Sequence, residues 1–231
     1  GLYFRGGGSA MKVRFMGHAA VKLEGNKVVY IDPFLRGNPQ AAETPDKVER
    51  CDIIVVTHDH ADHLGDAFEI ARKTGAVIVS QYEIAAKAQE EGLKAEPMNI
   101  GGPVEVAGVR VWLTDAKHTS GVGAPTGAII EMDRKRVYHA GDTGLFGDMK
   151  LIGEFFKPDV ALLPIGGRFT MDPEQAAKAV ELLGVKVVIP IHYNTWPLIQ
   201  ADPEEFKRLV GGKAQVVILQ PGEAYTLVEI G

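Results

Sequence analysis

Residues 57–63 read Thr57-His58-Asp59-His60-Ala61-Asp62-His63, and this stretch decides how the rest of the chain is interpreted. It directly follows the apolar run Ile53–Val56, which has the length and the β-branched composition of a buried strand. Side chains alternate along a strand and fan out around a helix, so neither element would bring all the imidazoles together. We therefore predict a loop that turns four side chains inward, followed by a helix from Leu64; the four are His58, His60, Asp62 and His63. Imidazole and carboxylate are ligands that suit zinc and similar divalent ions. The alternative, a solvated histidine-rich turn, is disfavoured directly behind an apolar strand.

The composition is that of an ordinary globular protein. The chain has 231 residues, of which 45% are hydrophobic and 24% charged, enough for one large domain with a substantial core. The segment Gly1–Ala10 contains Leu-Tyr-Phe-Arg followed by Gly-Gly-Gly-Ser and resembles the remnant of a protease site and linker. We therefore assign residues 11–231 to a single domain.

Charge, cysteine content and hydropathy restrict the partners. The net charge is −5, or −6 once Arg5 of the remnant is left out, which does not favour nucleic-acid binding, although a local basic patch stays open. Cys51 is the single cysteine, so no internal disulfide or cysteine-type zinc site is expected. No apolar run approaches the roughly 18 residues of a membrane span, and no signal-peptide pattern follows Met11. We expect a cytoplasmic protein that does not bind membranes and acts on a small-molecule or nucleotide-like substrate; a homo-oligomer is compatible with the sequence.

The order of predicted elements indicates two similar halves. Apolar runs predict strands at 12–16, 19–24, 27–31, 52–56, 76–80, 104–106, 109–114, 126–132, 135–139, 160–165, 186–191, 215–220 and 224–229. Helical spacing, caps and glycine stops predict helices at 64–74, 83–91, 146–156 and 172–183, and one that begins at Asp202-Pro203. Each half begins with a meander and continues with β-α alternation, a pattern that favours two sheets with helices outside.

The polar residues of interest follow the ends of predicted strands. His58, His118, Asp142 and His192 each come just after an apolar run. Strand ends on one rim of a sheet are where ligand sites gather in layered α/β folds. Two metal ions need about seven or eight protein contacts plus water, and the chain offers seven candidates if one carboxylate bridges: His58, His60, Asp62, His63, His118, Asp142 and His192.

The whole pattern resembles the metallo-β-lactamase superfamily. The His-x-His-x-Asp-His motif, the lone His118, Gly141-Asp142-Thr143 and His192 follow in the order of its signature. Three further segments resemble its small metal-dependent hydrolase branch, related to ascorbate-6-phosphate lactonase-like proteins and to RNase Z: Gly17-His18-Ala19, Asp32-Pro33-Phe34 and His192-Tyr193-Asn194-Thr195-Trp196. The resemblance covers Met11 to Gly231.

The resemblance implies an α+β fold, the αββα four-layer sandwich of two mixed β-sheets face to face with helices outside. It implies a first metal held by His58, His60 and His118, and a second held by Asp62, His63 and His192. Asp142 would bridge the two ions, and Asp62 and Asp142 would be the catalytic carboxylates. Two divalent ions are expected as cofactors; zinc is favoured, and manganese, iron and nickel suit the same ligands.

Such a site supplies a nucleophile. Zinc lowers the pKa of a bound water from 15.7 to about 7, so a bridging hydroxide forms at neutral pH and can attack a carbonyl carbon or a phosphorus. Gly141 suits this position because glycine permits close backbone approach and unusual dihedrals.

Seven other residues receive supporting roles. His18, Arg168, Tyr193 and Asn194 are candidate substrate contacts, with a structural histidine, a surface arginine and core packing as the alternatives. Asp32, His139 and Thr143 are candidates to support the ligands by hydrogen bonds, and packing or turn capping is the alternative for them. Asp59 is expected to face solvent or a supporting partner.

The function predicted is metal-dependent hydrolysis of a phosphodiester or of an ester or lactone. A long basic insertion that would grip transfer RNA is absent, which weakens the RNase Z interpretation. Two other functions stay open. One is redox chemistry at a diiron site, although His60 stands where flavin-linked members place a carboxylate. The other is a metal-binding scaffold without turnover.

Overall fold

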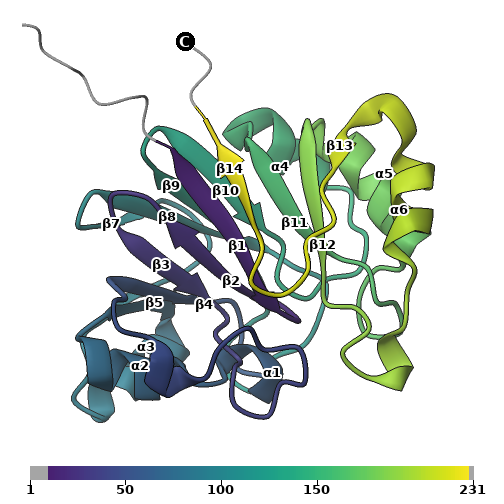
Figure 1. The fold of residues 1–231 in the computed structure, drawn as a ribbon. Coiled ribbons are helices and arrows are strands. Elements are labelled where there is room, and N and C mark those ends of the chain that lie inside the picture. The colour runs from purple at the N-terminus through teal and green to yellow at the C-terminus, as the bar shows by residue number, and fades with distance from the viewer. Residues whose placement is uncertain (1–9, 229–231) are drawn as a thin grey trace, which may run out of the picture.

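Two seven-stranded β-sheets face each other in the computed structural model, which describes residues 10–228 (Figure 1). In the order in which they pair, the strands of the first sheet are β14 (Ala224–Leu227), β1 (Met11–Gly17), β2 (Ala20–Glu24), β3 (Val28–Ile31), β4 (Ile53–Val56), β5 (Val77–Gln81) and β6 (Ala95–Met98). Those of the second are β13 (Gln215–Val216), β12 (Val187–Ile191), β11 (Val160–Pro164), β10 (Lys135–His139), β9 (Thr126–Met132), β8 (Val109–Asp115) and β7 (Val104–Val106).

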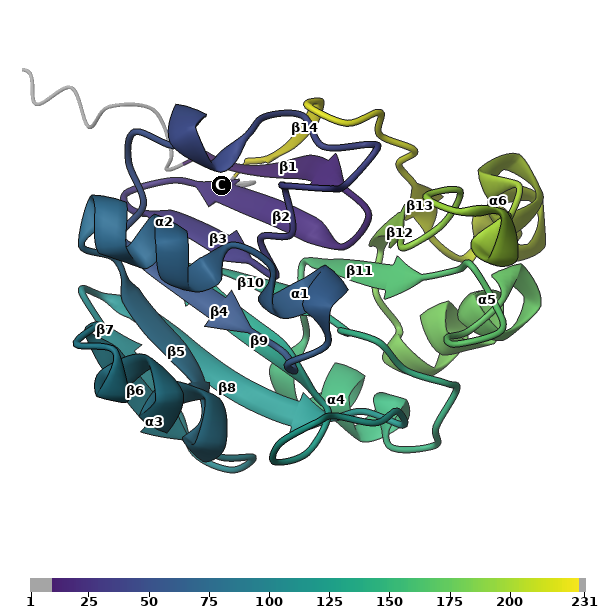
Figure 2. The same cartoon turned by 90° about the horizontal axis from the view of Figure 1, so that it is seen from below.

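Helices cover the outer faces of both sheets. On the first sheet lie α2 (Ala67–Thr74) and α3 (Tyr82–Glu90), and on the second lie α4 (Met149–Phe156), α5 (Pro173–Leu183) and α6 (Pro203–Val210). The four-residue helix α1 (Ala61–Leu64) lies instead at the rim between the sheets (Figure 2). The predicted αββα sandwich is therefore confirmed.

Three apolar clusters hold the layers together. The central one fills the space between the sheets, with side chains such as Val21 and Ile31 from the first sheet and Ile130 and Leu162 from the second. The other two join each sheet to its own helices. This arrangement explains the continuous apolar runs: a strand such as β4 is buried on both faces, so all four of its residues are apolar.

Both sheets are mixed in the same way. Strands β3 to β6 pair in parallel, as do β10 to β13, whereas the remaining pairs are antiparallel. The carboxyl ends of parallel strands meet at one edge of a sheet, so the loops after β4, β10 and β12 reach the same rim of the sandwich.

Local signals place most helix ends correctly. Asp172 accepts a hydrogen bond from the backbone N–H of Gln175 at 2.9 Å, as the Asp-Pro-Glu-Gln cap predicts, and α5 begins at Pro173. Gly75 closes α2 in the left-handed conformation, with φ of 77°.

Three predicted elements differ from the structure, and one observed strand was not predicted. Asp62 and His63 lie on the helical turn α1 rather than in a loop, and α4 starts at Met149 rather than at residue 146. Strand β6 was not predicted because its sequence is Ala-Glu-Pro-Met; a proline is tolerated there because β6 is an edge strand. The strand predicted at 215–220 pairs only over Gln215–Val216.

Two further predictions concern the chain ends. The proposed linker remnant lies, apart from Ala10, outside the described residues, as does Glu229 of the last predicted strand. Among residues 10–228, no helix combines the length and the apolar character needed to cross a membrane.

Gly153 allows α4 to pack closely against the end of α5. A Cβ at this position would overlap the backbone of Leu183, whereas a Cβ at Gly147, in the turn before α4, would meet no atom within 4 Å. We expect Gly153→Ala to lower the free energy of unfolding by about 1–3 kcal/mol, the usual cost of overpacking, and Gly147→Ala to leave it within about 0.5 kcal/mol. Urea denaturation of both variants measures this, and equal stabilities would contradict the packing described.

Candidate metal centre

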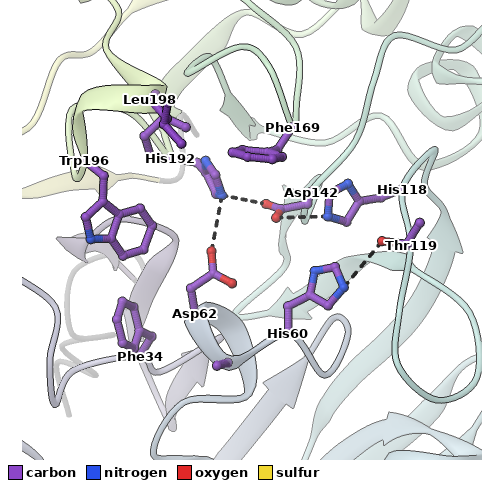
Figure 3. Close-up of a pocket in the computed structure, with 12 residues that line it drawn as sticks. Phe34, His60, Asp62, His118, Thr119, Asp142, Phe169, His192, Trp196 and Leu198 are labelled. Atoms are coloured by element: carbon purple, nitrogen blue, oxygen red, sulfur yellow. Dashed lines mark hydrogen bonds and ion pairs between the residues drawn. The ribbon is translucent and has the colours of Figure 1, made fainter.

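Seven imidazole and carboxylate side chains meet at the rim where the loops after β4, β8, β10 and β12 converge. Figure 2 shows these loops, and Figure 3 shows the side chains of His60, Asp62, His118, Asp142 and His192. His58 and His60 follow β4, Asp62 and His63 lie on α1, His118 follows β8, Asp142 follows β10 and His192 follows β12. These are the seven candidates that the sequence offered. Both sheets contribute to the centre, because β4 belongs to the first sheet and the other three strands to the second.

Asp142 lies at the middle of the cluster. Its Oδ2 is 2.9 Å from Nε2 of His63, 3.4 Å from Nε2 of His118 and 3.6 Å from Nε2 of His58. Its Oδ1 is 3.3 Å from Nε2 of His192. Ligand atoms bound at about 2.1 Å around a tetrahedral ion stand about 3.4 Å apart, so these separations are of the size that a metal requires.

Unpartnered polar atoms support a metal in this place. Nε2 of His58, of His63 and of His192 and Oδ1 of Asp142 are buried and have no hydrogen-bond partner. A buried polar atom without a partner is costly, so such a group indicates that something else satisfies it. The donor atoms form two sets of four within 4.8 Å: His58, His60, His118 and Asp142, and His18, Asp62, His63 and His192. The residues present therefore fit divalent ions.

Asp32 and Thr57 fix two of the imidazole rings. Nδ1 of His63 donates to Oδ2 of Asp32 at 2.7 Å, and Nδ1 of His58 donates to Oγ1 of Thr57 at 2.9 Å. Thr57 in turn donates its hydroxyl to Asp32 at 2.6 Å. With hydrogen on Nδ1, each ring presents a lone pair on Nε2 toward the cluster, which is the tautomer that a metal ligand needs.

His18 is buried beneath the cluster and supports it from three atoms. Its Nε2 donates to Oδ2 of Asp62 at 2.8 Å, its Nδ1 accepts from the hydroxyl of Thr195 at 2.6 Å, and its carbonyl accepts from the backbone N–H of His192 at 2.8 Å. Burial lowers the pKa of His18 to about 4, so the ring is neutral. The sequence suggested substrate contact for His18; the structure places it behind the cavity wall instead.

His139 and Thr143 make backbone contacts. Nε2 of His139 donates to the carbonyl of Ala19 and its Nδ1 accepts from the N–H of Gly141, so both ring nitrogens are occupied and neither is available to a metal. The Thr143 hydroxyl accepts from the backbone N–H of Lys117 at 2.9 Å and donates to the carbonyl of Gly144. Both residues thus fix the loops that carry His118 and Asp142.

Unusual backbone conformations gather at the cluster. His18, Asp32 and His192 have positive φ values of 59°, 48° and 55°, which non-glycine residues seldom adopt. Gly141 has φ of 64°, and a Cβ there would lie 2.5 Å from the carbonyl oxygen of Thr126. The expectation that glycine suits the position before Asp142 agrees with this close approach.

Asp59 has a supporting partner, the second of the two possibilities that the sequence left open. Its carboxylate accepts from the backbone N–H of Gly121 at 2.6 Å and from the hydroxyl of Ser120 at 3.0 Å. Asp59 therefore connects the loop after His118 to the loop that carries His58 and His60 by hydrogen bonds. An aspartate between two ligands is a weak signal, because the partner loop is about sixty residues away in sequence.

The cavity above the cluster has a volume of about 580 Å³ and mostly apolar walls. Phe34, Phe169, Trp196, Leu198 and Ile199 line it together with several of the ligands (Figure 3). None of the four predicted substrate contacts lines it. His18 lies behind the wall, Arg168 stands over the ring of Phe169, Tyr193 is buried, and Asn194 accepts a hydrogen bond from the backbone of Ala201. Phe34, Phe169, Leu198 and Ile199 were not predicted, since apolar residues outside long regular elements carry no distinctive pattern.

The family to which the chain belongs follows from comparison with known proteins. The family model described as the beta-lactamase superfamily domain matches residues 27–193. The chain belongs to this superfamily. Metal-dependent hydrolases from Korarchaeum cryptofilum and Thermococcus kodakarensis are 53% and 54% identical to it over 94% of this chain and 100% of theirs. The solved structure of Igni18, a metallo hydrolase from Ignicoccus hospitalis, is 46% identical, with a TM-score of 0.90 over 95% of this chain and 99% of that one. The predicted relationship to this superfamily and to its metal-dependent hydrolases is therefore confirmed.

Electrostatics divide the histidines of this superfamily member into two classes. Burial lowers the pKa of His58 to about 3 and also lowers that of His118, so both rings are neutral. Burial opposes the charge on His192 too, but the carboxylates of Asp142 and Asp62 outweigh it and raise its pKa to about 9. The pKa of His63 is raised well above its usual value by Asp142 and Asp32 despite burial. Without metal, His63 and His192 therefore carry protons at neutral pH.

A metal ion must displace those protons. Because the pKa values of His63 and His192 are raised, zinc binding at pH 7.5 is expected to release roughly two protons, and the apparent zinc affinity should increase as the pH rises toward about 9. Calorimetric titration of the chelator-treated protein in two buffers of different ionisation enthalpy measures the release. The same titration at pH 9.5, above the raised pKa of His192, should release fewer protons. Heats that do not depend on the buffer at pH 7.5 would contradict the assignment.

His18 allows a second test of the centre. His18→Ala removes the hydrogen bond that fixes Asp62, and loss of such a support typically weakens metal binding about 10- to 100-fold. Thr195→Val removes only the hydroxyl that orients the His18 ring and should have a smaller effect in the same direction. Competition with a chromogenic chelator measures the zinc affinity, and circular dichroism checks the fold. A folded His18→Ala protein with wild-type affinity would contradict the support role.

Proposed function

We propose that this protein is a hydrolase that depends on two divalent metal ions and acts on an ester or lactone or on a phosphodiester. The observation that carries the proposal is the convergence of seven ligand side chains on a cavity, with four of their inward atoms buried and unpartnered. Two ions held there would supply a hydroxide nucleophile near neutral pH and polarise the bond that is attacked.

The ligand geometry supports two neighbouring ions rather than one. His58, His60 and His118 would hold the first, and Asp62, His63 and His192 the second. Asp142 is suited to bridge them, because its carboxylate faces both sets. Its Oδ2 lies near His58 and His118 of the first set and nearest to His63 of the second, and its Oδ1 faces His192 of the second. Zinc is the ion that we favour, since imidazole and carboxylate suit it; manganese, iron and nickel accept the same ligands.

The chain's own residues position and protect the reaction. Asp62 and Asp142 carry the negative charge that balances the ions, and the pKa of each is held far below its usual value, against the effect of burial, by the surrounding histidines. Asp62 is the more exposed of the two, and both carboxylates line the cavity. The apolar walls limit access of bulk water.

Elemental analysis with a variant tests the proposal. The wild-type protein purified without chelator and supplied with zinc or manganese should hold about two ions per chain and hydrolyse members of an ester, lactone and phosphodiester panel. Asp142→Ala should lose at least one ion and bring turnover to background, because it removes the bridging carboxylate. Asp115→Ala, which removes an exposed carboxylate outside the cavity, is the matched control and should match the wild type.

Other outcomes favour the competing functions. Metal well below one ion per chain would count against any metal centre. Bound iron with a coloured, oxygen-reactive protein would favour redox chemistry, and two ions without turnover of any panel member would favour a metal-binding scaffold.

A further inference from the structure

The mouth of the cavity carries large apolar side chains that water covers in the free protein. Of the ten large apolar side chains that are exposed within residues 10–228, three surround this opening: Phe169, Trp196 and Leu198, at 52%, 38% and 58% exposure. Exposed apolar groups gathered at a cavity indicate that a ligand covers them. A volume of about 580 Å³ suits a small molecule rather than a polymer.

One wall of the cavity is a rigid aromatic pair. The rings of Phe34 and Trp196 have centroids 6.2 Å apart and are inclined by 36° (Figure 3). The buried ring of His18 packs behind them, with its centroid 4.8 Å from Trp196 and 6.0 Å from Phe34. Pro33 precedes Phe34 and Pro197 follows Trp196, and each proline limits the freedom of its segment. The wall is therefore preformed, which favours binding of a flat or branched apolar group.

Apart from the metal site, the cavity offers no group of opposite charge to a second anionic group on the substrate. Neither lysine nor arginine lines it among the described residues, and its charged groups are the proposed metal ligands. The Arg168 guanidinium lies over the ring of Phe169, and Lys117 lies 3.6 Å from Asp115. Thr119, the one polar lining residue that is not a proposed ligand, faces His60. A second carboxylate or phosphate on the substrate would be buried here without compensation.

We propose that the substrate is a small, otherwise uncharged carboxylic ester or lactone whose aryl or branched-alkyl group packs against Phe34 and Trp196. The inference rests on the hydrolytic function proposed above. Water adds to the acyl carbon, the bond from that carbon to the leaving oxygen breaks, and the leaving oxygen takes a proton. One water is consumed, and the products are a carboxylic acid and an alcohol, or a hydroxy acid from a lactone.

A series of esters with one leaving group isolates the recognition of the acyl part. We would compare p-nitrophenyl phenylacetate, acetate and hemisuccinate, the last of which carries a remote carboxylate, on zinc-loaded protein. Phenylacetate should exceed acetate in kcat/KM by about tenfold or more, as expected for an apolar group in a matching pocket, and hemisuccinate should be the poorest. Bis(p-nitrophenyl) phosphate should be hydrolysed less efficiently than phenylacetate.

Variants then test the aromatic wall. Trp196→Ala and Phe34→Ala should each reduce the ratio of phenylacetate to acetate kcat/KM by roughly tenfold. Phe155→Ala is the matched control, because Phe155 is an exposed aromatic on α4, 70% exposed and outside the cavity, and it should keep the wild-type ratio. Metal content and circular dichroism identify a variant that has failed to fold, and Trp196→Leu then takes its place with the same expectation.

The outcomes separate the two proposals. Metal-dependent turnover that favours hemisuccinate or the phosphodiester, or a ratio that neither wall variant changes, would overturn the substrate class and keep the hydrolase. Absence of turnover on every compound by protein that holds two ions would overturn the hydrolase itself.

Discussion

The contact on which the centre depends is that between the Asp142 carboxylate and the imidazoles of His58, His63, His118 and His192. All five side chains are buried or nearly so, and a carboxylate buried among unpartnered nitrogens is stable only if positive charge accompanies it. In the free chain that charge is the protons on His63 and His192, whose pKa values are raised for this reason. Protons and metal ions thus compete for the same imidazole nitrogens, and either can balance the negative charge of Asp142.

The relative position of the two sheets brings these side chains together. Asp142 and His192 come from the second sheet, whereas His58 and His63 come from the end of the first, so the two sheets must meet with their strand ends level. Hydrogen bonds between the halves fix this register: His192 donates its backbone N–H to His18, and His139 donates to Ala19. The packing of apolar residues between the sheets is unspecific by comparison, since many apolar side chains fill a core equally well.

Residues with a strong local pattern were predictable from sequence, and those defined by tertiary contacts were not. The buried strands are continuous apolar runs, and the Asp172 cap has a fixed spacing, so both were found. The histidine motif predicted a common site, but not that α1 would carry Asp62 and His63. Strand β6 was missed because edge position overrides the composition of Ala-Glu-Pro-Met.

The residues that support the ligands also divide into those that a local pattern predicts and those that only tertiary contacts define. Asp32 was expected to hydrogen-bond a ligand histidine, because that is a common arrangement around metal sites, and it does accept from His63. The partner of Asp59 lies on a loop about sixty residues later, and the orientation of His18 depends on Thr195, which is 177 residues away. No local pattern encodes such pairs. They become visible only when the fold brings the two halves of the chain together.

His18 connects the two parts of the proposed site, the ligands and the aromatic wall. Its ring donates a hydrogen bond to Asp62 and packs against Trp196 on another side. The centroid of the ring lies 4.0 Å from that of the His192 ring. Because the ring is fully buried and both nitrogens are bonded, it has little freedom to move independently. A substrate that presses on the wall therefore acts on a ring whose other contacts are proposed metal ligands. In the proposed site, substrate shape and ligand geometry would therefore be coupled through one side chain, whose backbone has a positive φ of 59°.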